Sequence, residues 1–173
     1  MKKLFFFGYL ISAGLTVLLF YSINGLTEPL GSADGTWGGG NGNPGIFPLV
    51  FLWPFLCLFL YGTTAYSMRL MKRAWPAAKI RVSAAVFALL AIGIAVYQVA
   101  AAQAVRKELI RLHPSFNEDH LPSLLNTYTN SIFFNLLTFI MIVLFCLLAG
   151  CLWALVRMQE PGGRQISPRY KRQ

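Results

Sequence analysis

Charged residues, and acids above all, are scarce in this chain of 173 residues. Only 12% of the residues are charged and six are acidic, whereas 56% are hydrophobic. A soluble domain usually carries about 25% charged residues. A water-exposed surface is hard to build from half that amount, so the composition favours a membrane protein. The 15 basic residues lie beside hydrophobic segments, and nothing resembles a nucleic-acid-binding module, so we expect no nucleic-acid partner.

Asp, Glu, Lys, Arg and His are also missing from the central part of every long hydrophobic segment. Such groups inside a membrane usually mark proton relays, ion paths or cofactor ligands. Their absence argues against a pump, a proton-coupled transporter and a haem held by paired histidines. The segments also lack a His-Glu metalloprotease motif and any Ser–His or Ser–Lys pair. We therefore predict no catalytic residue, no cofactor and no enzymatic activity.

Four hydrophobic segments are long enough to cross a membrane as α-helices. They cover residues 4–23, 46–68, 82–104 and 132–156. About 20 residues with a rise of about 1.5 Å each match the hydrocarbon thickness of about 30 Å. We predict an all-α fold, a polytopic transmembrane four-helix bundle in residues 1–156. A basic, disordered cytoplasmic tail is expected in residues 157–173.

The first segment has a second interpretation as a cleaved signal peptide. Lys2 and Lys3 would form its basic start, and Gly31-Ser32-Ala33 would offer small residues for cleavage. The apolar run is longer than the usual core of about 7–15 residues, and the candidate cleavage site lies well beyond its end. We favour an uncleaved helix.

The distribution of basic residues predicts the orientation. Four spans place both termini on one side, which then collects twelve of the fifteen basic residues, whereas the other side holds five of the six acids. The positive-inside rule assigns the basic side to the cytoplasm, so we predict a multi-pass cell-membrane protein with both termini inside. The basic residues between the second and third spans and in the tail could also contact anionic lipid or an acidic partner, rather than set the topology alone. These residues are Arg69, Lys72, Arg73, Lys79, Arg81, Arg164, Arg169, Lys171 and Arg172.

Small residues recur at helical spacing in two of the segments, where they can let helix backbones approach closely. On the third segment they are Ala84, Ala88, Ala91, Ala95 and Ala102, and on the first they are Gly8, Ser12 and Thr16. The alanine face predicts that the third helix lies at the centre of the bundle. The ridge on the first segment suits a partner helix, and the alternative is that the buried polar groups line a substrate path.

Pro54 lies inside the second segment, where it should kink the helix near Val50. Gln98 and Asn135 are polar residues near the outer half of the third and fourth segments. Together, the kink and the two amides could form a gate or a pocket.

The loop before the fourth segment contains His113, Glu118, Asp119 and His120. Imidazole and carboxylate groups together could bind Zn²⁺. Their spacing matches no known ligand pattern, so we predict a solvated loop and no metal site.

These features predict a small, non-enzymatic membrane protein that acts as an accessory or scaffold subunit of a membrane complex. It would act through helix packing with other membrane subunits or with itself. The alternative is a small oligomeric transporter or channel, and a third hypothesis is a membrane enzyme that uses the outer His, Glu and Asp residues. The lysine-led start and the compact loops are typical of a bacterial chain.

Overall fold

The computed structural model describes residues 2–30, 43–112 and 123–159, and these residues contain helices and no strand. The elements are α1 (Lys2–Gly25), the 3-10 helix η2 (Pro44–Ile46), α2 (Phe47–Ala74), α3 (Ala77–Leu112), α4 (Asn130–Phe133) and α5 (Leu136–Gln159). The prediction of an all-helical chain is confirmed. Four helical stretches are long and apolar enough to cross a membrane, and they are Lys3–Gly25, Pro44–Ala74, Ala77–Leu112 and Asn130–Gln159.

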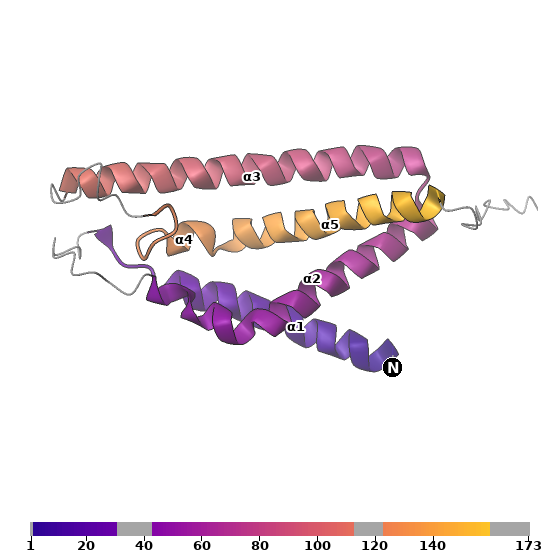
Figure 1. Cartoon of the computed structure of the whole chain (residues 1–173), viewed down its shortest axis with the longest axis horizontal. Helices are drawn as coiled ribbons and strands as arrows, with labels where there is room; N and C mark the ends of the chain where they lie inside the picture. The colour runs from indigo at the N-terminus through magenta and orange to yellow at the C-terminus, as the bar shows by residue number, and fades with distance from the viewer. Residues whose placement is uncertain (1, 31–42, 113–122, 160–173) are drawn as a thin grey trace, which may run out of the picture.

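The long helices alternate in direction and pack in the order α3, α5, α2, α1 (Figure 1). Helix α5 contacts α3 on one side and α2 on the other, and α1 packs mainly on α2. The prediction that the third helix is central is therefore wrong. The central position belongs to α5, whose buried Cys151 and Ala154 pack with Met71 of α2 and with Ile80 and Ala84 of α3. Small residues on α5 thus allow close approach from two sides, whereas the alanine face of α3 serves one neighbour.

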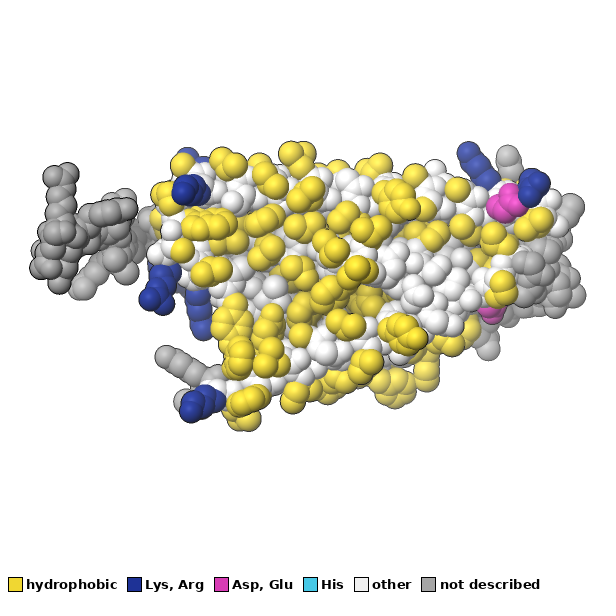
Figure 2. Space-filling model, turned by 180° about the vertical axis from the view of Figure 1, so that it is seen from behind, with side chains coloured by type: hydrophobic (Ala, Val, Ile, Leu, Met, Phe, Trp, Pro, Cys, Tyr) yellow, Lys and Arg dark blue, Asp and Glu magenta, His cyan; other side chains and the backbone are white. Residues whose placement is uncertain are grey.

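The two ends of the molecule differ in charge. The start of α1, the turn between α2 and α3 and the end of α5 lie at one end (Figure 1). We call this the basic end, because Lys and Arg side chains gather there (Figure 2). We call the opposite end, where α1 and α3 finish and α4 lies, the amide end. The two acids of the described residues, Glu28 and Glu108, belong to the amide end.

The helices continue beyond the apolar segments that predicted them. Helix α2 ends at Ala74 and α3 begins at Ala77, so most of the basic connector is helical. Charged residues such as Lys and Arg are good helix formers, and hydropathy alone does not detect them. Pro76 ends α2, because the residue before a proline is driven out of the helical region. Accordingly, Trp75 has an extended backbone, with φ −124° and ψ 140°.

Helix α2 bends in its first half, the half that contains Pro54 (Figure 1). Proline has no N–H for the carbonyl four residues earlier, and its ring crowds that carbonyl. The bend turns the second part of α2 from α1 towards α5.

The fourth span differs from the continuous helix that was predicted over residues 132–156. It is interrupted at Phe134 and Asn135, which separate the short α4 from α5. Two other ends also differ. Helix α3 extends to Leu112, eight residues beyond its predicted end, and α5 extends to Gln159, into residues that were predicted as tail.

Candidate functional site

The interruption between α4 and α5 frees backbone groups that a continuous helix would pair. Phe134, with φ −123° and ψ 71°, leaves the helical region. Asn135 then caps the new helix, because its Oδ1 accepts a hydrogen bond from the N–H of Thr138 at 3.1 Å. Its Nδ2 donates to the carbonyl oxygens of Ser131 at 2.8 Å and Ile132 at 2.9 Å. One amide side chain therefore serves both sides of the break.

Amide side chains from two other helices donate hydrogen bonds to the backbone carbonyl groups at the break. Asn24 of α1 donates from Nδ2 to the carbonyl oxygen of Phe134 at 2.9 Å. Gln98 of α3 donates from Nε2 to the carbonyl oxygen of Ile132 at 3.0 Å and to Oγ1 of Thr138 at 2.5 Å. Backbone groups that leave a helix away from water need such partners to replace the lost bonds. The three amides thus hold α1, α3 and the broken helix together.

Two further asparagine side chains form a hydrogen-bonded pair next to the break. Asn43 donates from Nδ2 to Oδ1 of Asn130 at 2.5 Å, and Asn130 donates back to Oδ1 of Asn43 at 3.1 Å. Asn130 is fully buried at the start of α4. A Cβ atom at Gly45 would overlap the Asn130 amide, so glycine is required for this approach. We call Asn24, Asn43, Gln98, Asn130 and Asn135 the amide cluster.

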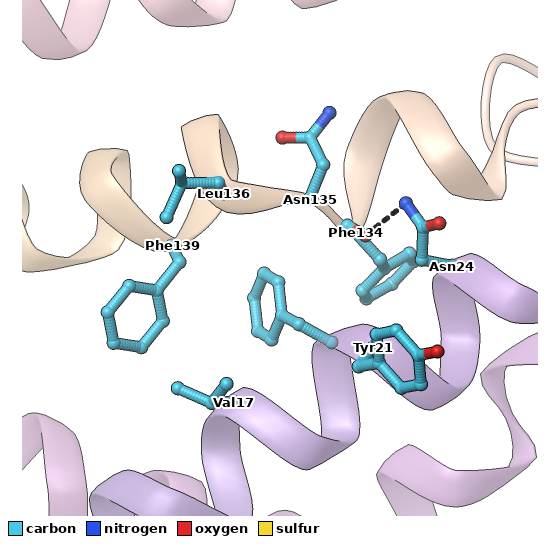
Figure 3. A pocket seen from close by; sticks show the side chains of 8 residues that line it. Val17, Tyr21, Asn24, Phe134, Asn135, Leu136 and Phe139 are labelled. Atoms are coloured by element: carbon cyan, nitrogen blue, oxygen red, sulfur yellow. Dashed lines mark hydrogen bonds between the residues drawn. The ribbon is translucent and has the colours of Figure 1, made fainter.

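A pocket of about 360 Å³ lies between α1 and the break. Its lining on α1 consists of Val17, Phe20, Tyr21 and Asn24. The opposite wall consists of Phe134, Asn135, Leu136 and Phe139 (Figure 3). The pocket therefore exists because the chain leaves helical geometry at this point.

Aromatic rings form much of this wall. The ring of Phe20 lies edge-on to the ring of Phe134 at 5.7 Å and to the ring of Phe139 at 6.2 Å. The amide of Asn135 points away from these rings, and the amide of Asn24 is turned towards the backbone of Phe134 (Figure 3). The interior of the pocket is consequently apolar, with its polar groups committed to the helix break.

The small residues predicted to pack helices lie mostly inside the protein. Ser12 and Thr16 are buried, and each hydroxyl donates to the carbonyl four residues earlier in α1. Ala84, Ala91 and Ala102 are buried on α3. Gly8, Ala88 and Ala95 are partly buried. The ridge of small residues on α1 is therefore covered by other parts of the same chain.

Two other glycines mark close helix contacts, and neither was predicted from the sequence. On α2, Gly62 lies under the ring of Tyr9, whose Cε2 would be 2.9 Å from an added Cβ. On α5, an added Cβ at Gly150 would be 2.9 Å from the Cβ of Ser67 and 3.0 Å from the backbone nitrogen of Met68. Isolated glycines in apolar helices were the available signal, since glycine there often has a packing reason.

Several predicted contact residues lie outside the described ranges. These are His113, Glu118, Asp119 and His120 of the outer loop, together with Arg164, Arg169, Lys171 and Arg172 of the tail. The described part of the chain contains no group of three or more His, Cys, Asp or Glu side chains that could hold a metal. Five of the basic residues predicted to contact lipid or a partner are described, in the last turns of α2 and the first turns of α3. They are Arg69, Lys72, Arg73, Lys79 and Arg81.

Gln98 and Asn135 were predicted to contribute to a gate or a pocket. Both bond to the backbone at the helix break, and Asn135 also lines the pocket. Asn24 was not singled out from the sequence. Its position at the end of an apolar segment was the only available signal, and many interfacial asparagines share it. No family model, curated protein or solved structure matches this chain.

Proposed function

We propose that the chain is an integral membrane protein with both ends on the cytoplasmic side, and that it is a non-enzymatic accessory or scaffold subunit of a membrane complex. The observation that carries the proposal concerns the buried polar side chains. Within the described residues, the buried Ser12, Thr16, Ser67, Gln98 and Asn130 all bond to atoms of the protein itself. These groups serve helix geometry and packing.

Exposed apolar side chains support membrane insertion. Large side chains on all four long helices face outwards, among them Tyr21, Val50, Leu89 and Leu136. Soluble monomers rarely expose contiguous apolar patches of this extent. Yellow hydrophobic surface covers the middle of the molecule between its two ends (Figure 2). A bilayer would cover this band and leave the charged ends in water.

The charge difference between the ends supports the orientation. The basic end holds Lys3, the cations in the last turns of α2, Lys79 and Arg81 at the start of α3, and Arg157 at the end of α5. None of the acids in the described residues lies there. An excess of Lys and Arg marks the cytoplasmic side of membrane proteins. The same cations would attract anionic headgroups at about 1 kcal/mol each.

The amide contacts favour a subunit over a transporter. A gate would need polar groups that face a path, and the amides of Gln98 and Asn135 instead bond to the backbone around residue 132. The neighbouring pocket is lined by aromatic and aliphatic side chains. A charge-free site of this kind suits packing better than transport of a polar substrate.

The helix row has two edge helices, α1 and α3, and we assign the open face of α3 to a partner helix. Helix α3 has α5 as its main neighbour along its length, so its opposite face meets no helix of the described chain. Gly93 lies in the middle of this face, and an added Cβ there would meet no atom of the described residues within 4 Å. A small residue on an unpartnered face permits close approach of another helix.

The test compares two matched substitutions in the full chain at native expression. Gly93→Leu adds bulk to the open face of α3, and Gly14→Leu adds the same bulk to α1, where an added Cβ also meets no described atom. Both changes raise helix propensity, so neither should unfold the protein. After purification in mild detergent, we expect a stoichiometric membrane partner with the parent chain and with Gly14→Leu. Gly93→Leu should lose it.

Two results would contradict the proposal. A parent chain that is purified alone and monomeric would remove the accessory role. A partner retained equally by both variants would remove the assignment to α3. Selective flux of a solute through vesicles that contain the pure chain would favour the transporter alternative instead.

A further inference from the structure

The packing role gives no use to the pocket between α1 and the helix break. Its rim is formed by side chains that protrude from the protein surface: Tyr21 is 78% exposed, Leu136 is 72% exposed and Val17 is 51% exposed. The pocket therefore opens sideways, on the surface that faces lipid if the chain is inserted as proposed. A ligand would enter from the bilayer.

The lining determines the chemistry of that ligand. The rings of Phe20, Phe134 and Phe139 form the floor, and the two amides of the lining are bonded to the helix break. A water molecule needs two to four polar partners to be held in a cavity, and this interior offers a nearly apolar wall instead. A polar or charged ligand would lose its hydration without replacement. The site suits a hydrocarbon group.

The volume and the length of the pocket limit which hydrocarbon group it can hold. The volume of about 360 Å³ lies near the lower end of small-ligand pockets. The lining on α1 runs from Val17 to Asn24, a rise of about 10 Å. A single flexible hydrocarbon chain fits such a space.

The position of the pocket along α1 indicates where the polar end of the ligand would lie. Asn24 lies one residue before the end of α1, at the amide end of the molecule, and the pocket extends from there towards the middle of the helix. A phospholipid of the leaflet at the amide end has the same order, with its headgroup at the interface and its chains directed inwards. We propose that the pocket holds one acyl chain of a phospholipid from that leaflet.

A photo-crosslinking experiment tests this proposal. The full chain is reconstituted in phosphatidylcholine vesicles that contain a small fraction of phosphatidylcholine with a diazirine on one acyl chain, and labelled peptides are mapped by mass spectrometry. These vesicles contain no other protein, so the exposed face of α3, which includes Leu89, is not covered by the proposed partner and reports ordinary lipid contact. We expect stronger labelling of residues 17–24 and 134–139 than of this face.

Matched variants distinguish a bound chain from general contact. Val17→Phe adds bulk at the rim, and Val96→Phe adds the same bulk on exposed α3. Leu136→Trp and Leu89→Trp form a second pair, at residues that are 72% and 70% exposed. The two rim variants should lose the excess labelling, down to the level of α3, whereas the two α3 variants should retain it.

The proposal rests on membrane insertion, and the reference labelling separates the two claims. Labelling of the α3 face without an excess at the pocket overturns the acyl-chain site alone. An excess that survives both rim variants also overturns it. If the α3 face itself is unlabelled, insertion fails and the acyl-chain site fails with it.

Discussion

Asn24→Leu should destabilise the protein more than Gln98→Leu, although Gln98 is the more deeply buried amide. The reason is the number of hydrogen-bond donors that the carbonyl group bonded to each amide keeps after the substitution. The carbonyl oxygen of Phe134 accepts from Asn24, and the described residues offer it no other donor. The carbonyl oxygen of Ile132 accepts from Gln98 and also from Asn135. Removing Asn24 orphans a carbonyl, and removing Gln98 does not.

The magnitudes follow from that difference. The bond between Asn24 and the Phe134 carbonyl is partly buried, and an acceptor left unpaired away from water costs about 1–3 kcal/mol. A hydrogen bond between membrane helices contributes about 0.6 kcal/mol on average, and the loss of Gln98 should lie near that value. Ser22→Leu is the control, because the exposed Ser22 hydroxyl bonds only within α1, to the carbonyl of Leu18. Its effect should stay within about 0.5 kcal/mol, as is usual for surface changes.

The assay is equilibrium unfolding in mixed micelles with an increasing fraction of denaturing detergent, followed by circular dichroism. The expected order of destabilisation is Asn24→Leu, then Gln98→Leu, then Ser22→Leu. Equal losses for the first two variants, or a larger loss for Gln98→Leu, would refute the reasoning from carbonyl partners.

Three further predictions concern packing and permeability. Gly150→Ala should destabilise the protein by about 1–3 kcal/mol in the same assay, because the added Cβ would meet Ser67 and the backbone of Met68. Gly93→Ala should instead stabilise the protein by up to about 1 kcal/mol. An equally large destabilisation by Gly93→Ala would contradict the contact geometry. Gly62→Ala should loosen α1 from α2, because the new methyl group would overlap the Tyr9 ring, and a spin-label distance between the two helices should increase. Vesicles that contain the pure chain should stay as tight to ions and small polar solutes as empty vesicles, and a selective leak would contradict the packing role.

Apolar length predicted the number and type of the helices, because a run of about 20 apolar residues has few alternatives to a membrane helix. Helix ends were predicted less well. Helix α3 runs on through Arg106, Lys107 and Glu108, which hydropathy counts as loop although they continue the helix. The extension is held by tertiary contacts, since Leu109 is fully buried against Leu30 and Tyr128. Such contacts join segments that are distant in the sequence.

The helix break could not be predicted from the sequence, because it depends on partners from other helices. An asparagine in an apolar run is compatible with a continuous helix or with a cap. Asn135 is a cap here because Asn24 and Gln98 supply donors for the carbonyl groups that the break releases. The order of the helices in the row could not be predicted from the sequence either. The alanine face of α3 and Gly150 of α5 both permit close packing, so small residues alone do not identify the central helix.

Membrane topology is the measurement that tests the central claim most directly, because the partner surface and the acyl-chain site both depend on insertion with four spans, and the proposed orientation places the basic end inside. Reporter domains are fused after Gly40, Arg73, Glu118 and Gln173, one in each segment that follows a span. The account predicts cytoplasmic signals at Arg73 and Gln173 and external signals at Gly40 and Glu118. An external signal at Arg73 or Gln173 would contradict it.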